Sequence, residues 1–123
     1  MKRVLIVDDE AMNRDVIAKI LSKERFFILE AANGKEALEI LKKDNIDLVL
    51  IDIMMPVMDG FETIEVIRMQ SCYDKVPLIA VTALNDNQTI QKVLELGVSS
   101  YISKPFVLSE LVKSVKTVLK IPV

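Results

Sequence analysis

Five polar side chains lie at or just after the ends of short apolar runs in this 123-residue chain. Asp8 and Asp9 follow the first run, Asp52 follows the third, Thr82 follows the fourth, and Lys104 comes after the fifth. Short, β-branched apolar runs are typical of strands that helices cover on both faces. Because parallel strands end at one edge of their sheet, where ligands bind, we expect these side chains to share that edge.

Three carboxylates at one edge require a cation nearby. Like charges about 4 Å apart cost roughly 4 kcal/mol at an effective dielectric of about 20. Oxygen-only ligands suit Mg²⁺, which keeps several waters and binds one or two carboxylates together with a phosphate group. The ammonium of Lys104 could balance the same charge or bind phosphate oxygens. The cluster of Asp8, Asp9 and Asp52 therefore predicts a magnesium site that works with a phosphoryl group.

The elements that hold these residues alternate along the chain. The apolar runs predict five strands: Val4–Val7, Phe26–Glu30, Leu48–Ile51, Leu78–Val81 and Val98–Ile102. Apolar residues at helical spacing predict five helices between and after them: Met12, Val16 and Ile20; Ala37, Leu38 and Leu41; Ile64 and Ile67; Ile90, Val93 and Leu94; Leu111, Val115, Val118 and Leu119. This order indicates an α/β fold with a doubly wound five-stranded parallel sheet and helices on both faces. In the flavodoxin-like strand order 2-1-3-4-5, the first and third strands are neighbours, so Asp8, Asp9 and Asp52 converge.

The composition excludes several classes of function. The chain has no histidine, so it holds no histidine base or histidine metal ligand, and its three glycines cannot form a GxGxxG or P-loop motif. The net charge of −2 lacks the basic character of a nucleic-acid binder. One cysteine, Cys72, forms no internal disulfide and fits the cytoplasm. No apolar run approaches the roughly 20 residues of a membrane span.

Each of these residues also has a purely structural interpretation. An aspartate between a strand and a helix most often caps the helix, but Asp8 and Asp9 are adjacent, and no helix end lies near Asp52. Taken singly, Thr82 is expected to be a hydrogen-bonded hydroxyl near a strand end, and Lys104 a solvated surface charge. The combination favours function.

With these residues placed, the chain resembles a receiver domain of the two-component response regulators over about residues 2–120. The resemblance rests on Asp8 and Asp9, the stretch 52–60 with the sequence DIMMPVMDG, Thr82-Ala83 and Lys104-Pro105-Phe106. It implies a signalling protein rather than an enzyme. Such a protein takes a phosphoryl group from the phosphohistidine of a sensor histidine kinase or a histidine phosphotransfer protein, with Mg²⁺ required.

The resemblance also implies a role for each matched residue. Asp52 matches the phosphoacceptor; Asp9, Asp52 and the backbone carbonyl of Met54 match metal ligands, with Asp8 beside them. Lys104 matches the residue that pairs with the phosphoryl oxygens. Thr82 and Tyr101 match the switch residues. The output surface would be the fourth helix, fifth strand and fifth helix, which serves a downstream protein or domain and allows a homodimer.

The chain departs from the commoner family pattern at three positions. Val107 stands where a polar residue often caps the last helix. Met54 and Leu84 stand two residues after Asp52 and Thr82, where family side chains border the path of the hydrolytic water. Neither side chain can orient that water, so we expect slow self-dephosphorylation.

Three alternatives remain open. A haloacid-dehalogenase-like phosphotransferase also uses a strand-end aspartate, but the position of its general acid is Met54 here. A flavodoxin-like module is disfavoured by six aromatic residues and no tryptophan. A pseudo-receiver would bind a partner without being phosphorylated, but the presence of Asp8, Asp9, Asp52, Thr82 and Lys104 argues against it. We expect residues 1–123 to form one receiver domain with no effector domain in this chain.

Overall fold

The computed structural model describes residues 1–73, 75–83 and 86–122. Within these residues, five strands alternate with five α-helices and one short 3₁₀ helix, η1. Their bounds are β1 Arg3–Val7, α1 Ala11–Lys23, β2 Phe27–Ala31, α2 Gly34–Lys43, β3 Leu48–Asp52, α3 Gly60–Met69, η1 Ser71–Tyr73, β4 Leu78–Thr82, α4 Asn87–Glu95, β5 Ser100–Ser103 and α5 Leu108–Val118. None of the helices in the described part of the chain is long and apolar enough to cross a membrane.

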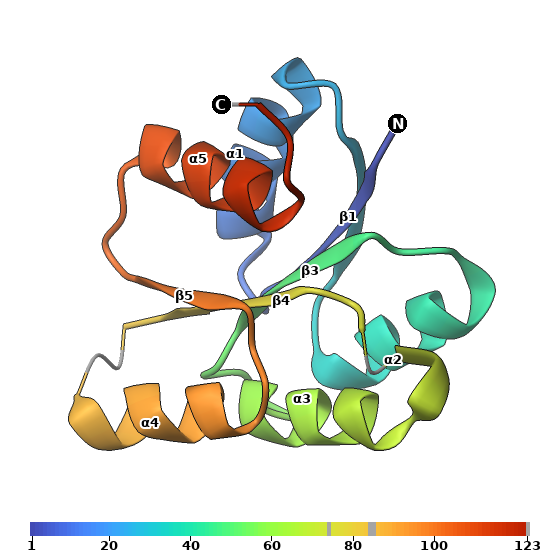
Figure 1. Cartoon of the computed structure of the whole chain (residues 1–123), viewed down its shortest axis with the longest axis vertical. Helices are drawn as coiled ribbons and strands as arrows, with labels where there is room; N and C mark the ends of the chain where they lie inside the picture. The colour runs from blue at the N-terminus through green and yellow to red at the C-terminus, as the bar shows by residue number, and fades with distance from the viewer. Residues whose placement is uncertain (74, 84–85, 123) are drawn as a thin grey trace.

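The five strands form one parallel sheet in the order β2-β1-β3-β4-β5, which confirms the predicted fold class. Helices α1 and α5 lie on one side of the sheet, and α2, α3 and α4 lie on the other (Figure 1). β1 and β3 are adjacent, and Val7 pairs with Ile51. The residues that follow these two positions, Asp8 and Asp52, therefore meet at the same edge.

Alternation along the strands explains the two layers of core. Leu5 and Ile51 point toward α2 and α3, where Ala37 and Ile64 are buried with them. Their strand neighbours point the other way, and Ile6, for example, is buried among α1 and α5 residues. Because both faces of β1, β3 and β4 are covered, these strands read as continuous apolar runs.

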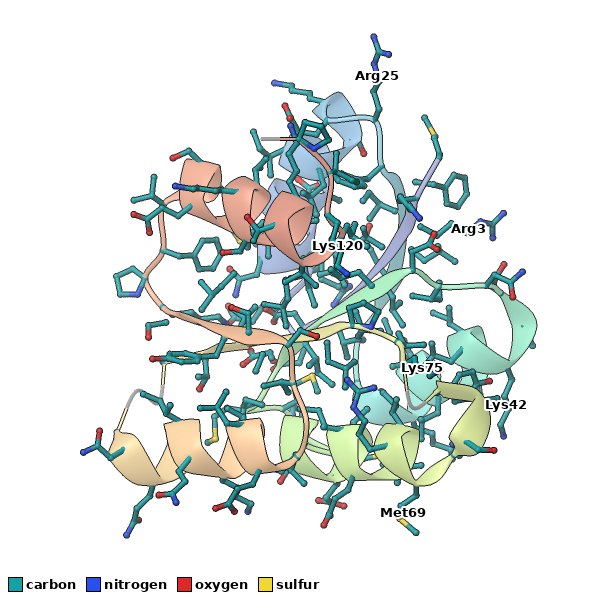
Figure 2. All side chains as sticks on the ribbon, in the orientation of Figure 1. Arg3, Arg25, Lys42, Met69, Lys75 and Lys120 are labelled. Atoms are coloured by element: carbon teal, nitrogen blue, oxygen red, sulfur yellow. The ribbon has the colours of Figure 1, made fainter. Side chains whose placement is uncertain are left out.

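The structure corrects the phase of the first helix. Of the predicted residues Met12, Val16 and Ile20, Ile20 packs partly buried against the core, but Met12 is 80% exposed and Val16 is 49% exposed. The buried residues of α1 are Ile17 and Leu21. Both sets have helical spacing, and burial against β1, β3 and α5 selects the second set. Met69 at the end of α3 also points into solvent rather than into the core (Figure 2).

Polar side chains cap the starts of two helices. Asn33 accepts a hydrogen bond from the backbone N–H of Glu36, and Asp86 accepts one from Thr89. Val107 provides no side-chain cap for α5. Two strands begin later than predicted: β2 begins at Phe27 rather than Phe26, and β5 begins at Ser100 rather than Val98. Phe26 and Val98 are nevertheless buried, so their apolar character reflects core packing outside the strands.

Candidate functional site

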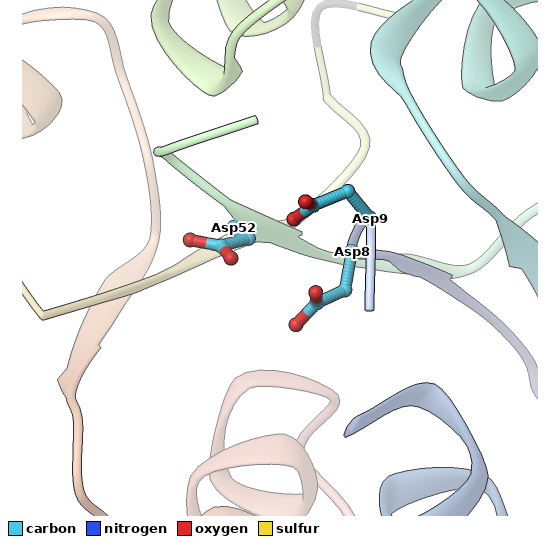
Figure 3. A group of neighbouring side chains, drawn as sticks. All are labelled: Asp8, Asp9 and Asp52. Atoms are coloured by element: carbon cyan, nitrogen blue, oxygen red, sulfur yellow. The ribbon is translucent and has the colours of Figure 1, made fainter. Parts of the chain in front are cut away.

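Three carboxylates gather where β1 and β3 end. One oxygen from each of Asp8, Asp9 and Asp52 lies within 4.8 Å of the others, and Figure 3 shows the three neighbouring side chains at the ends of the two strands. Asp8 and Asp52 are buried, at 3% and 6% exposure, whereas Asp9 is exposed. The cluster is therefore open to solvent through Asp9 and enclosed on its protein side.

Lys104 supplies the positive charge at this cluster. Its Nζ lies 3.0 Å from Oδ2 of Asp52 and 3.5 Å from Oδ2 of Asp8. The residue follows β5, and its backbone N–H donates to the carbonyl of Thr82 at 2.8 Å. The peptide bond to Pro105 is cis. Lys104 thus reaches the carboxylates from a strand that is two positions away from β3 in the sheet.

Burial and charge shift the pKa values of Asp52 and Lys104 in opposite directions. Burial raises the pKa of Asp52 above its usual range, against the hydrogen bond and positive charge of Lys104. Burial of Lys104 favours its neutral form, but the hydrogen bond and negative charge of Asp52, together with Asp8, raise the pKa of Lys104 overall. The lysine therefore stays protonated beside carboxylates that lie in a partly desolvated site.

The β1–α1 loop is held by residues that the sequence analysis did not select. The guanidinium of Arg14 donates to the backbone carbonyl of Asp8 at 2.6 Å and to Glu30 at 3.1 Å. The Asp8 carboxylate accepts from the backbone N–H of Glu10 at 2.9 Å and lies 3.5 Å from Nδ2 of Asn13. An arginine six residues after an aspartate matches no known sequence motif, so the sequence alone does not indicate this contact.

The loop after β3 packs back onto the strand that carries Asp52. Oδ1 of Asp52 accepts from the backbone N–H of Met54 at 3.2 Å, and Gly60 donates its N–H to the carbonyl of Ile53 at 2.9 Å. A Cβ at position 60 would lie 2.5 Å from the Asp52 carbonyl oxygen. Glycine at position 60 therefore permits the close approach of α3 to the acidic site.

The other predicted residues lie on neighbouring strands. Thr82 is the last residue of β4 and is 1% exposed, and the residue before it pairs with Asp52. Tyr101 lies on β5, pairs with Ala80 and is 36% exposed. Met54 is 60% exposed at the rim. Leu84 lies outside the described residues.

The fold and the site together define a doubly wound, flavodoxin-like α/β protein with an acidic, lysine-paired pocket at the carboxyl edge of its sheet. Residues 4–116 match the family model of the response regulator receiver domain. Sporulation initiation phosphotransferase F of Bacillus subtilis is 36% identical over 118 residues, which cover 96% of this chain and 94% of that protein. Probable transcriptional regulators ycf27 of Porphyridium aerugineum and Guillardia theta are 39% and 40% identical, and this chain spans only 48% and 46% of their length.

Solved structures agree with this match. Chemotaxis protein CheY4 of Vibrio cholerae superimposes with a TM-score of 0.91 and 33% identity, covering 96% of this chain and 98% of that one. The receiver domain of a Pseudomonas aeruginosa sensor histidine kinase, solved with a magnesium ion in its active-site cleft, has a TM-score of 0.88 and 28% identity, with coverage of 97% and 98%. The chain belongs to the response regulator receiver family of two-component signalling.

Proposed function

We propose that this chain is a phosphorylatable receiver in which Asp52 accepts a phosphoryl group from a partner's phosphohistidine. The observation that carries the proposal is the position of Asp52: its carboxylate lies between two further aspartates and the ammonium of Lys104. The proposed nucleophile, an anionic cluster suited to a cation and a positive charge are thus close together. Family membership supports the same assignment.

The three carboxylates fit Mg²⁺ by their chemistry. Asp9 and Asp52 each offer oxygen to the space in which the three side chains meet, with Asp8 beside them. The backbone carbonyl of Met54 is proposed as a further ligand. Oxygen ligands with room for water suit Mg²⁺ better than a soft metal, and when bound this ion would neutralise charge on the transferred phosphoryl oxygens. The Pseudomonas relative binds its ion in the corresponding kind of cleft.

The proposed reaction is an in-line displacement at phosphorus. An Asp52 oxygen forms the new P–O bond while the P–N bond to the donor imidazole breaks, so no base on this chain is needed. Lys104 neutralises negative charge as it spreads over the phosphoryl oxygens. The imidazole is supplied by a sensor histidine kinase or a histidine phosphotransfer protein, since this chain has no histidine.

The phosphoryl group would act on the buried hydroxyl of Thr82. Thr82 ends β4 next to the acceptor strand, and a new dianion would draw the hydroxyl and Lys104 inward. Tyr101, which is part exposed on β5, would then change rotamer and alter the surface of α4, β5 and α5. A downstream protein or domain would bind this surface, which could also form a homodimer. A cavity of about 370 Å³ beside Tyr101, lined also by Phe106 and Glu110, leaves room for repacking there.

The proposed setting is the cytoplasm, where the exposed thiol of Cys72 stays reduced. The compartment also contains the kinase domains that receivers use as donors. Transcriptional output is not proposed for this chain alone, because the matching regulators are about twice as long.

Intact-mass measurement tests the proposal directly. The chain is incubated with acetyl phosphate and Mg²⁺, with a chelator as the control. We expect one phosphoryl adduct that requires Mg²⁺ and disappears in Asp52→Asn, while Asp47→Asn, away from the site, keeps it. A folded chain that gains no adduct would instead be a pseudo-receiver.

A second variant tests the switch. Thr82→Ala should still be phosphorylated but should lose most of the phosphorylation-dependent shift of the Tyr101 resonance in NMR spectra. An unchanged shift would remove Thr82 from the switch. The haloacid-dehalogenase-like alternative predicts turnover of external phosphate esters, which a phosphate-release assay would detect.

A further inference from the structure

A second cavity adjoins the acidic site on the side of α1. Its volume is about 410 Å³, and it lies between α1 and the segment that follows β5. Asp8 and Lys104 belong to its lining, so the cavity opens directly next to the proposed phosphoryl site. Neither Asp52 nor Thr82 lines it, and the proposed reaction does not use it.

The walls of this cavity are mainly apolar. Val16 and Ile17 contribute from α1, and Ala83, Pro105 and Phe106 contribute from the loops after β4 and β5. Ile17 is 4% exposed, whereas Val16 is 49% exposed and forms part of the opening. The cavity therefore has a polar end, at Asp8, Asn13 and Lys104, and an apolar body that is accessible from solvent.

Asp8 and Lys104 offset each other at the polar end, so with a divalent cation at the carboxylates this arrangement matches an amphipathic anion. An apolar cavity of about 150 Å³ is sufficient for a benzene ring, so the volume beside Lys104 holds a phenyl group with room for water. A ligand with a phosphate at one end would place its charge toward the ammonium of Lys104 and its apolar group against Val16 and Phe106. The charged end of the ligand would then face the polar end of the cavity, and its apolar end would face the apolar walls.

We propose that this cavity binds the apolar acyl group of small acyl phosphates, so that the chain prefers phosphoryl donors with an apolar leaving group. The inference rests on the proposed function and names a class of substrate for it. In the reaction, an Asp52 oxygen bonds to phosphorus, and the bond between phosphorus and the acyl oxygen breaks. The products are the aspartyl phosphate and the free carboxylate, so one mixed anhydride replaces another without any further reactant.

Benzoyl phosphate and acetyl phosphate form the test pair, because both donors release carboxylates of similar basicity. The second-order rate constant for phosphorylation of the intact chain is measured by mass spectrometry with each donor, in the presence of Mg²⁺. Burial of one aromatic ring at the usual gain for apolar surface corresponds to roughly a tenfold preference for benzoyl phosphate. Val16→Asn should reduce the ratio of the two rate constants to about twofold.

Met12→Asn is the matched control. Met12 is also an apolar, exposed residue on α1, but it does not line the cavity. The ratio of the two rate constants in Met12→Asn should equal that of the parent chain. A ratio that falls equally in both variants would mean that the general apolar character of α1, rather than the cavity, causes the preference, and it would overturn the proposal.

Binding is measured separately with the leaving group itself. Titration of the parent chain with benzoate should shift the backbone amide resonances of Ile17, Ala83 and Phe106, whereas acetate should leave them in place. Equal rate constants for the two donors, or benzoate shifts outside the cavity, would overturn the proposal. Failure of both donors to modify Asp52 would instead refute the proposed function, so the two failures are distinguishable.

Discussion

The ammonium of Lys104 lies 3.0 Å from Oδ2 of Asp52, although 52 positions separate the two residues in the chain. The same ammonium lies 3.5 Å from Asp8. Two buried carboxylates thus share one cation, and Asp9 stands outside this pairing at the solvent side of the cluster. Asp8 and Asp52 together carry one more negative charge than Lys104 neutralises, and Asp9 adds a second.

That excess charge predicts the effect of removing Asp9. Asp9→Asn should raise the free energy of unfolding without Mg²⁺ by about 0.5–1 kcal/mol, since solvent screens part of the repulsion. The same variant should lose most of the stabilisation that Mg²⁺ gives the parent chain. Denaturant unfolding with and without Mg²⁺ measures both effects, and Glu39→Gln on α2 is the control. If Asp9→Asn were less stable than the parent chain without Mg²⁺, the carboxylates would not repel one another as expected.

Arg14 is expected to position the acidic loop. It holds the carbonyl of Asp8 at 2.6 Å and anchors it to Glu30 on β2. Loss of groups that orient metal ligands typically weakens metal binding 10–100-fold, and we expect about tenfold for Arg14→Ala. Calorimetric titration with Mg²⁺ provides the measurement. Glu30→Gln keeps the bond to Asp8 and should have a smaller effect, and equal effects in both variants would argue against this role.

Gly60 is expected to tolerate no side chain. A Cβ there would lie 2.5 Å from the Asp52 carbonyl oxygen and 2.6 Å from Cα of Ile53, both in the backbone. Gly60→Ala should lower the free energy of unfolding by about 3 kcal/mol and slow phosphorylation of Asp52, because α3 must move. Glu65→Ala, at an exposed position of the same helix, is the matched control for urea unfolding. If Gly60→Ala were as stable as the parent chain, the backbone would be able to move aside for the methyl group with little loss of stability.

Met54 is expected to prolong the phosphorylated state. Its side chain is 60% exposed at the rim of the site and cannot orient water toward the aspartyl phosphate. Met54→Asn should therefore accelerate hydrolysis at least about fivefold by supplying a polar group for that water. The decay of the phosphoryl adduct is followed by intact mass, with Met69→Asn as the control. An unchanged decay rate in Met54→Asn would count against the hypothesis.

Asp86 makes a contribution to stability that depends on pH. Hydrogen bonds from the backbone N–H and the hydroxyl of Thr89 lower the pKa of Asp86 below its usual value in the folded chain. The unfolded chain therefore binds more protons just below pH 4, so stability from this cap is present above that pH and is lost as the pH falls through the folded pKa. Asp86→Asn can still cap α4 but does not titrate at this position. The difference in unfolding free energy between the two proteins should shrink between pH 5 and pH 2; a constant difference would refute the assignment.

The sequence alone determined the alternation of strands and helices, the parallel sheet and the edge at which the polar residues lie. These properties follow from local periodicity and from the rule that parallel strands end on one side, so Asp8, Asp52 and Lys104 could be assigned to one site. The caps at Asn33 and Asp86 were predictable for the same reason, because a cap joins residues that are three positions apart.

Tertiary structure decided which face of α1 is buried, where β5 begins and which groups hold the acidic loop. Met12 and Val16 have the same spacing as Ile17 and Leu21, and only packing against the sheet and α5 distinguishes the two sets. The bond from Arg14 to Asp8 and the cavity beside Lys104 depend on how α1 and the loop after β5 lie against each other. Such features arise from contacts between distant segments, which no local pattern in a single sequence encodes.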